Sequence, residues 1–296
     1  RVAPLYRDLS TQAQDQAILP PPPGWRKIVL STNIAESSLT IEGIRIVLDT
    51  GLMRVPRFDP RSGMTRLVTV NISQASAEQR RGRAGRNESG LCVRCWEEGT
   101  HRTLAARTPP EILQTDLTSV ALELAAWGIR DASELSWVDP PPAGALAQAR
   151  QLLQILGGID GDGRVTEHGR KMSNLPVHPR LAHMILQGTA LNCGLLACDL
   201  AAVLSEQDFL KGTAAQTHTD LRGRLEEYDR QVNRRESSGV IQRIRRASET
   251  WQRDLGLSVQ PKSRKRSQSD AIGILLALAY PDRIAQRQPD DTRRYK

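Results

Sequence analysis

The spacing of apolar residues changes along this chain of 296 residues. Before "RTPPEI" (107–112) the apolar residues form short unbroken runs such as "KIVL" and "IRIVL". After it they recur at helical spacing, as in Leu117, Val120 and Leu124. Short runs of Ile, Val and Leu are typical of buried parallel strands, whereas the wider spacing is typical of helices with one buried face. The pattern therefore predicts an α/β part followed by an α-helical part.

The first part predicts two buried parallel strands, at 26–32 and 43–51. Between them, "NIAESSLTIE" is expected to form a loop and a short helix at the carboxyl end of a strand, where α/β folds bind ligands. The segment around "DPRSG" alternates apolar and polar residues, which predicts a β-hairpin. A helix with Ser76 as its N-cap, broken near Gly82, and a strand at "GLCVRCW" (90–96) follow.

The second part predicts one helix from Glu111 and another in "PPPAGALAQARQLLQIL" (140–156), which a glycine pair closes. Next, "GGIDGDGRVTEHG" (157–169) is expected to form a small turn or hairpin. Two helices and a short hairpin resemble a winged-helix module. From Pro179 the helical pattern returns and continues to "AIGILLALAY" (271–280).

Three packing units are therefore expected: a partial α/β domain at 1–107, a winged helix at 108–178 and a helical remainder at 179–296. Within the last unit, "RLAHMILQGTAL" and "GLLACDLAAVL" predict helices. The stretch 221–255 is charged and only partly periodic, and "QPKSRKRSQSD" (260–270) predicts a polar basic loop.

The composition adds charge to this picture. The formal net charge is +8, which indicates an anionic partner such as nucleic acid, although a soluble protein can be basic without one. The apolar runs are shorter than the roughly 20 residues that cross a bilayer. Four cysteines make no disulfide framework at this length, which favours the cytoplasm. Because the chain begins with Arg1, we expect a piece of a longer polypeptide.

The octet "QRRGRAGR" (79–86) combines four arginines with two glycines. Guanidinium is always charged, and its planar fork can stabilise the charge that spreads during phosphoryl transfer. Arg83 and Arg86 are expected on the same side of a helix turn, with Gln79 one turn earlier. Gly82 and Gly85 would let a phosphate or a neighbouring domain approach the backbone. A generic basic RNA-binding patch is the alternative.

Four segments together carry a family resemblance. The octet resembles motif VI of the superfamily 2 helicases in the form used by the DEAH/RHA group, and "STNIAESSLTIEGI" (31–44) resembles that group's motif V. "GGIDGDGRVTEHGRKMSNLPVHPRLAHMIL" (157–186) resembles its winged-helix signature running into a helical bundle, and "LLALAYPDRIAQR" (275–287) resembles bacterial members. The resemblance implies a partial RecA-like parallel-sheet domain, then a winged helix and a helical bundle.

The resemblance also implies roles for matching positions. Three residues would act at the nucleotide, the arginines as fingers on the γ-phosphate: Gln79, Arg83 and Arg86. Four more would lie at the nucleotide or couple it to nucleic acid: Gly82, Glu42, Thr40 and Ser38. Two would contact the nucleic-acid backbone: Thr32 and Asn33. The alternative for the segment that begins at Ser31 is an ordinary strand-to-helix turn without a ligand.

The family further implies ATP with Mg²⁺, and single-stranded RNA as the partner, with DNA left open. Ile18 falls near the place of a base-stacking Phe in eukaryotic relatives, which leaves room for other nucleoside triphosphates. The chain contains no G-x-x-x-x-G-K-S/T and no DEAH-type acidic box, so we expect Mg²⁺ to be held mainly by an upstream domain. The implied enzyme is an ATP-dependent RNA helicase. This chain would be one part of it and should be inactive alone. The alternative is a non-catalytic RNA-binding module.

Other clusters in the sequence favour structure over chemistry. Cys92 and Cys95 have C-x-x-C spacing, but no second pair matches it, so no metal site is predicted. His178 and His183 lack the spacing of a metal-binding helix and favour packing or surface roles. The arginine-rich run 222–266 also contains many acids, which favours a solvated face, with an RNA-channel wall as the alternative.

Overall fold

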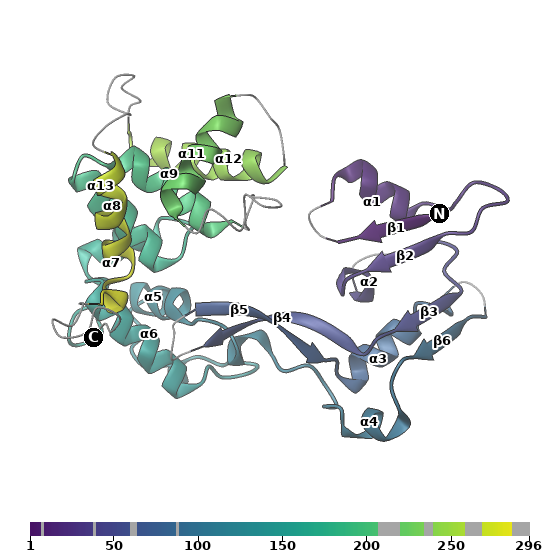
Figure 1. Ribbon diagram of the computed structural model, residues 1–296. Coiled ribbons are helices and arrows are strands. Elements are labelled where there is room, and N and C mark those ends of the chain that lie inside the picture. Colours follow the sequence, from purple (N-terminus) through teal and green to yellow (C-terminus); the bar gives the residue numbers. More distant parts are fainter. Residues whose placement is uncertain are drawn as a thin grey trace, which may run out of the picture. The chain divides into compact units, whose positions relative to one another are not determined.

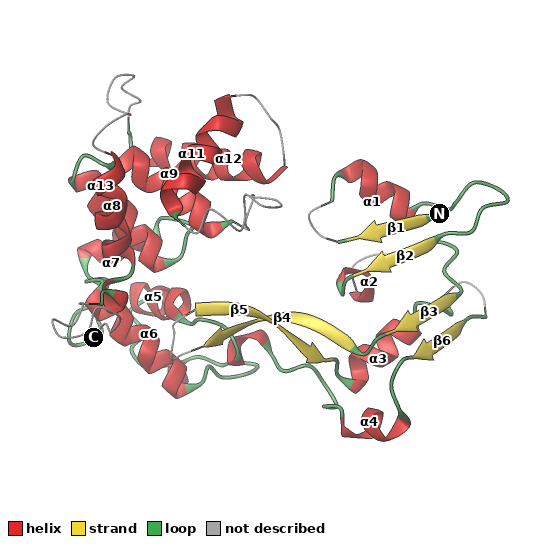
Figure 2. Ribbon diagram, viewed as in Figure 1, coloured by secondary structure: helices red, strands yellow, loops and turns green. Residues whose placement is uncertain are grey.

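A computed structural model describes residues 1–6, 9–37, 40–59, 64–86, 89–206, 220–233, 239–257 and 268–285. The chain divides into two compact units, Arg1–Asp116 and Leu117–Lys296. Figure 1 follows the chain by colour, and Figure 2 shows that the strands of the described residues belong to the first unit, while helices build the second. The α/β and α classes predicted from the sequence are confirmed, whereas the three domain boundaries stay a prediction.

The first unit contains short strands, with helices between them. Its elements are β1 (Val2–Leu5), α1 (Thr11–Ile18), β2 (Ile28–Ser31), α2 (Ile34–Ser37), β3 (Ile46–Asp49), β4 (Leu52–Asp59), β5 (Met64–Asn71), α3 (Gln74–Arg81), β6 (Leu91–Arg94), α4 (Glu98–Thr103) and the 3₁₀ turn η1 (Glu111–Leu113). Strands β1 and β2 pair in parallel, as do β3 and β6, whereas β4 and β5 pair antiparallel.

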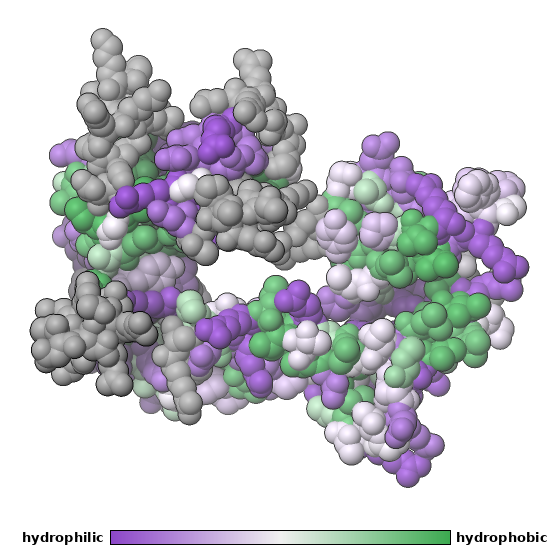
Figure 3. Space-filling model, in the orientation of Figure 1, coloured by the Kyte–Doolittle hydropathy of each residue, from purple (hydrophilic) through white to green (hydrophobic). Residues whose placement is uncertain are grey.

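The predicted strands at 26–32 and 43–51 form as β2 and β3, but the prediction that they are buried is wrong. Ile28 is 60% exposed, Ile46 63% and Leu48 69%. One face of the β1–β2 pair packs on α1, where Leu5 is buried. The opposite apolar face of each parallel pair is uncovered in the part of the chain that the structure describes (Figure 3). Parallel sheets are normally covered on both faces.

The predicted hairpin and the helix after it both form, with one correction. Strands β4 and β5 run in register from Leu52 opposite Asn71 to Asp59 opposite Met64. The N-cap of α3 is Ser73 and not Ser76, because the Ser73 hydroxyl accepts a bond of 3.1 Å from the Ser76 backbone N–H. The helix ends at Gly82 as expected. Its termination means that Arg83 and Arg86 lie in a turn and not on a helix.

Strand β1 and helices α1 and α4 have no counterpart in the sequence analysis. Helix α1 is short, and polar contacts stabilise its two ends. The Ser10 hydroxyl accepts from the Ala13 backbone N–H at 3.3 Å. The Lys27 amine donates to the backbone carbonyls of Ala17 and Leu19 at 2.8 and 2.6 Å. A cation at the C-terminal end of a helix stabilises the carbonyls there.

The second unit is helical. Its elements are α5 (Thr118–Ala126), η2 (Ala132–Glu134), α6 (Ala143–Ile155), α7 (Glu167–Ser173), α8 (Pro179–Ala190), α9 (Gly194–Ser205), α11 (Leu221–Asn233), α12 (Gly239–Asp254), α13 (Gln268–Ala279) and η3 (Pro281–Arg283). The helices predicted at 140–156, after Pro179 and at 271–280 are confirmed. The predicted basic loop at 260–270 lies largely outside the described residues. Among the described residues, no helix is both long and apolar enough to cross a membrane.

Two predictions near the winged helix form with bounds other than expected. The helix expected from Glu111 forms as α5 but begins later, at Thr118, because Glu111–Leu113 is a separate 3₁₀ turn. After that turn the Gln114 carbonyl accepts a bond of 3.0 Å from the Phe58 backbone N–H of β4. The small turn or hairpin expected at 157–169 forms as a turn closed by one antiparallel bridge, between Ile159 and Val165. Its last residues instead begin α7, which the hydroxyl of Thr166 caps.

The core of the second unit lies where α8, α9 and α13 meet. A side chain at Gly188 would come within 2.8 Å of Ala197 and Leu275, so the glycine permits close helix packing. Helix α12 packs on α9 and buries Ile244 and Trp251. The charged stretch is therefore two helices with buried faces, and not only a solvated surface.

Candidate functional site

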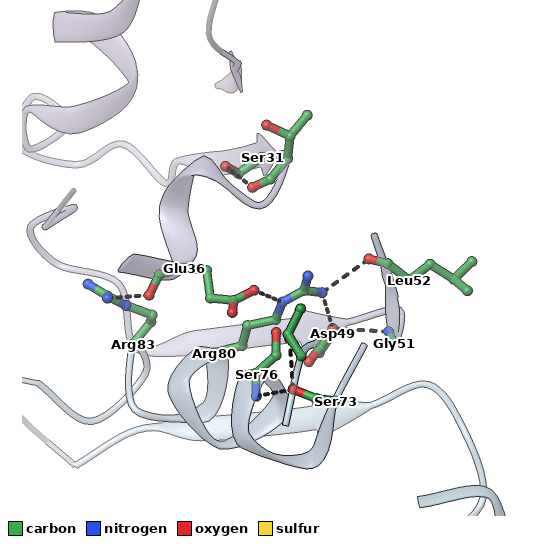
Figure 4. A network of polar contacts seen from close by, with 11 residues as sticks. Ser31, Glu36, Asp49, Gly51, Leu52, Ser73, Ser76, Arg80 and Arg83 are labelled. Carbon is green, nitrogen blue, oxygen red and sulfur yellow. Dashed lines mark hydrogen bonds and ion pairs between the residues drawn. The ribbon is translucent and has the colours of Figure 1, made fainter. Parts of the chain in front are cut away.

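The arginines of the octet lie in different environments. The Arg80 side chain is 15% exposed and that of Arg81 is 65% exposed. Arg80 points inward, where its Nε lies 2.9 Å from Oε2 of Glu36 and its Nη1 lies 2.9 Å from Oδ1 of Asp49 (Figure 4). The same Nη1 donates to the Leu52 carbonyl at 3.3 Å. Arg80 thus joins α2 and the end of β3 to α3.

Arg81 belongs to a surface cluster. It lies 2.6 Å from Glu78, one turn earlier on α3, and Arg94 of β6 approaches the same carboxylate to 2.5 Å. The hydrogen bond from Arg94, more than the charge of Arg81, lowers the pKa of Glu78. Surface pairs of this kind contribute little to stability. Arg81 therefore offers a matched comparison for its inward-facing neighbour.

Arg83 and Arg86 both reach the segment that follows β2. The Arg83 Nη2 donates to the backbone carbonyl of Glu36, and the Arg86 Nη1 donates to the hydroxyl of Thr40 at 2.5 Å. Between the two arginines, Ala84 is buried and anchors the turn. From this turn the Arg83 and Arg86 side chains both extend to contacts within residues 36–40.

An open hollow of about 310 Å³ lies at the end of α3. It is lined by Gln79, Gly82, Arg83 and Arg86. Two guanidinium groups and an amide supply hydrogen-bond donors, and the C-terminal end of α3 adds no acidic side chain to this lining. The lining suits an anion with several oxygens, such as a phosphate. The described residues contain no group of three His, Cys, Asp or Glu side chains that could hold a metal ion.

Thr32 and Asn33 lie at the carboxyl end of β2, as expected for a ligand-binding loop. The Thr32 backbone N–H donates to the Leu5 carbonyl of β1 at 3.2 Å, and the Asn33 carbonyl accepts from the Glu36 N–H at 2.9 Å. Both side chains are exposed. The bonds hold the backbone and leave the side chains facing outward.

The remaining predicted site residues separate into three cases. Thr40 is held by Arg86. Glu42 is exposed in the loop before β3 and is not part of the lining of the hollow. Ser38 lies outside the described residues. The roles assigned to all nine positions stay predictions.

Sequence reasoning missed the acids that hold Arg80. Asp49 is buried at the end of β3, where its Oδ1 also accepts from the Gly51 N–H at 3.0 Å, and its Oδ2 is buried without a hydrogen-bond partner among the described residues. The available signal was an acid directly after an apolar run, because buried charges are normally paired. Glu36, inside the motif V segment, carried no comparable signal.

Comparisons with known proteins identify relatives of this chain. Residues 1–88 match the family model described as "Helicase conserved C-terminal domain", and residues 149–177 match "Helicase associated domain (HA2), winged-helix". The ATP-dependent RNA helicase HrpB of Escherichia coli K12 is 40% identical over 294 residues, which are 99% of this chain and 33% of that protein. The crystal structure of E. coli DEAH/RHA helicase HrpB matches with a TM-score of 0.82 and 40% identity, over 97% of this chain and 34% of that one.

The chain belongs to the DEAH/RHA helicases. A eukaryotic member, the pre-mRNA-splicing factor ATP-dependent RNA helicase prp22 of Schizosaccharomyces pombe, is 40% identical over 205 residues, which are 69% of this chain and 18% of that protein. The chain thus spans 33% and 18% of the lengths of these two relatives. The family resemblance of the octet and of residues 31–44 is confirmed, since both segments lie within the matched helicase domain.

Proposed function

We propose that this chain is part of an ATP-dependent RNA helicase, in which it supplies the arginine side of the nucleotide site and a contact for single-stranded RNA. The observation that carries the proposal is the hollow lined by Gln79, Gly82, Arg83 and Arg86. It is supported by the names of the relatives, which are ATP-dependent RNA helicases.

At the hollow, the two arginines would stabilise charge on the γ-phosphate as it is transferred. Transferred phosphoryl groups carry negative charge over three equatorial oxygens, and a guanidinium fork binds two of them at once. Gln79 is exposed at the rim, where its amide could orient the attacking water. Mg²⁺ would neutralise phosphate charge when bound, but the described residues form no acidic group to hold it, so we derive no step through the metal.

RNA would be bound through its backbone at Thr32 and Asn33. Both are exposed at the carboxyl end of β2, and the chain carries a net charge of +8. Contacts to phosphate and sugar carry no sequence information, which suits a protein that moves along any strand. Thr40 would link this region to the nucleotide through Arg86. A cytoplasmic location is part of the proposal, and the four cysteines are free thiols.

A non-catalytic RNA-binding module is the rival, and substitutions in the octet separate the two. In the complete polypeptide that carries this chain, Arg83→Ala and Arg86→Ala should each lower kcat for ATP hydrolysis by roughly 10³–10⁵. RNA affinity without nucleotide should change little. Arg81→Ala is the matched control, because Arg81 lies in the same octet but bonds only to a surface acid in the described contacts.

Arg→Lys substitutions sharpen the test. Lysine keeps the charge but loses the planar fork, so Arg86→Lys should remain impaired if Arg86 binds phosphate oxygens. In a basic patch, each Arg→Ala would instead weaken RNA affinity and its salt dependence, while hydrolysis stayed unchanged. Hydrolysis at the parent rate by Arg86→Lys would contradict the assignment.

A further inference from the structure

Glu36 contacts two arginines of the octet through two different groups. Its carboxylate binds Nε of Arg80 at 2.9 Å, and its backbone carbonyl accepts a hydrogen bond from Arg83 (Figure 4). The carboxylate contact is to an arginine that is mostly buried, with 15% of its side chain exposed, whereas the carbonyl contact is to an arginine that lines the hollow. Glu36 of α2 therefore contacts both Arg80, which other residues also hold in place, and Arg83, which lines the hollow.

Arg80 itself is held too firmly to act on a ligand. Its guanidinium bonds to Glu36, to Asp49 and to the Leu52 carbonyl, and its side chain is 15% exposed. It does not line the hollow. A planar guanidinium held at separate nitrogens has one orientation, so Arg80 fixes the spacing between α2 and α3.

We propose that Arg80 and Glu36 are positioning residues, which set the place of the Arg83 guanidinium at the nucleotide. This inference rests on the proposed function, because it assigns a role to residues behind the hollow. When the Arg80–Glu36 pair is broken, α2 is free to shift, and the carbonyl that receives Arg83 shifts with it. A displacement of about 1 Å in a reacting arrangement can lower a rate by about 100-fold.

The same residue also connects to the proposed RNA contact. The Glu36 backbone N–H donates to the Asn33 carbonyl at 2.9 Å, so Asn33 and Glu36 belong to one turn of backbone. A backbone change at Asn33 is therefore transmitted to the carbonyl that holds Arg83. The positioning pair is thus placed to make the rate of hydrolysis depend on RNA.

The experiment compares substitutions in the complete polypeptide that carries this chain. Arg80→Gln removes the guanidinium. Glu36→Ala removes the carboxylate but keeps the backbone carbonyl and the Arg80–Asp49 pair. Glu36→Gln restores an oxygen that can accept from Arg80. The matched control is Arg81→Gln, which removes the same charge from the adjacent, exposed position. Steady-state kcat and KM for ATP are measured at saturating RNA, at a temperature where circular dichroism shows each variant fully folded.

We expect Arg80→Gln to lower kcat by about 100-fold and Glu36→Ala by about 10-fold, with KM for ATP within about 2-fold of the parent. Glu36→Gln should recover part of the loss, and Arg81→Gln should match the parent. A purely structural role would move the melting temperature but not kcat in folded protein. If Arg80→Gln does not fold, Glu36→Ala and Glu36→Gln decide, because they leave Asp49 bound to Arg80.

Arg83→Ala distinguishes a failure of the positioning role from a failure of the proposed function. If Arg83→Ala is impaired while folded Arg80→Gln and Glu36→Ala match Arg81→Gln, the positioning role is wrong and the proposed function stands. If the parent does not hydrolyse ATP, or if Arg83→Ala hydrolyses it at the parent rate, the proposed function itself is wrong and the positioning role is lost with it.

Discussion

The guanidinium of Arg180 binds the carboxylate of Asp282 through both Nη atoms, at 2.5 and 2.8 Å. Arg180 belongs to the first turn of α8 and is buried, and Asp282 lies in the η3 turn that follows α13. The same Nη1 donates to the Ala279 carbonyl at 3.2 Å. The pair therefore fastens the last described helix of the chain to α8.

Asp282→Ala should destabilise the second unit, because it leaves the buried Arg180 without its charge partner. We expect a loss of about 2–3 kcal/mol in the free energy of unfolding, somewhat below the value for a fully buried pair since Asp282 is partly exposed. Urea denaturation of the 296-residue chain, followed by circular dichroism, measures it. The control is Glu167→Ala, which removes an exposed partner of Lys171 and should change the free energy of unfolding far less. Equal losses would contradict the prediction.

A second prediction concerns pH and the histidine pair. His168 Nε2 of α7 and His183 Nδ1 of α8 lie 2.8 Å apart. Burial, reinforced by the neighbouring His168, lowers the pKa of His183 to about 4. Burial, with the charge of Lys171, also lowers the pKa of His168. An ordinary histidine has a pKa of about 6.5. Between that pH and the lower pKa of the folded state, these histidines bind more protons in the unfolded chain than in the folded chain.

The stability of the second unit should then be complete above pH of about 6.5 and should fall as the pH is lowered toward 4. A shift of the His183 pKa from about 6.5 to about 4 corresponds to about 3 kcal/mol, and we expect about 1–2 kcal/mol because solvent reaches part of the ring. Urea titrations at several pH values measure the slope. His183→Gln should flatten it, and an unchanged slope in that variant would refute the assignment.

A third prediction concerns two glycines near the turn that carries Arg83 and Arg86. A side chain at Gly90 would lie 1.9 Å from the Ala84 carbonyl oxygen and 2.8 Å from that of Arg45, and backbone cannot easily yield. Gly90→Ala should therefore displace the turn and cost about 3 kcal/mol or more in stability. Gly85→Ala is the control, since nothing lies within 4 Å of its added methyl group.

Thermal denaturation of the chain should show a marked fall for Gly90→Ala, whereas Gly85→Ala should be neutral or slightly stabilising, by about 0.4–1 kcal/mol at most. In the complete polypeptide, ATP hydrolysis should fall with Gly90→Ala in protein that is still folded, because Arg83 and Arg86 move with the turn. Similar melting temperatures for the two variants would show that the turn is not held by this contact.

The fourth prediction concerns RNA. The isolated chain should bind single-stranded oligonucleotides weakly, with affinity that falls as salt rises, by about 0.7 logarithmic units per phosphate contact for each tenfold increase in salt. Fluorescence anisotropy at low and moderate salt measures this. Asn33→Ala should weaken binding, whereas Glu98→Ala, at an exposed residue of α4 paired with Arg102, should not. Binding that ignores salt, or none at low salt, would contradict the proposed contact.

Local signals in the sequence were sufficient for most elements. The hairpin followed from alternation on both sides of a turn, and α8, α9 and α13 followed from apolar spacing with clear ends. The N-cap prediction at Ser76 was wrong because the true cap, Ser73, is an equally small polar residue three positions earlier. The start of the helix expected from Glu111 was placed too early for a different reason. Residues 111–113 form a separate turn, and the Gln114 carbonyl after it is bonded to Phe58 in a distant strand.

The site was predictable in its composition but not in its arrangement. Gln79, Gly82, Arg83 and Arg86 could be chosen from the octet and share one hollow. The octet alone could not show that Arg80 points inward while Arg81 points outward, because both carry the same charge and they are adjacent in the sequence. That difference depends on Asp49, which lies 31 residues earlier and is brought to Arg80 by the fold.

The uncovered apolar faces of the two parallel strand pairs have a consequence for how the chain behaves in solution. Ile28 and Leu30 on one pair, and Leu48 on the other, are each at least 60% exposed. Excluded salts such as sulfate strengthen the burial of apolar surface, whereas added salt weakens contacts to phosphate. Raising sulfate should therefore drive copies of the chain together while it releases them from RNA, so purification in high sulfate would select for aggregates free of nucleic acid.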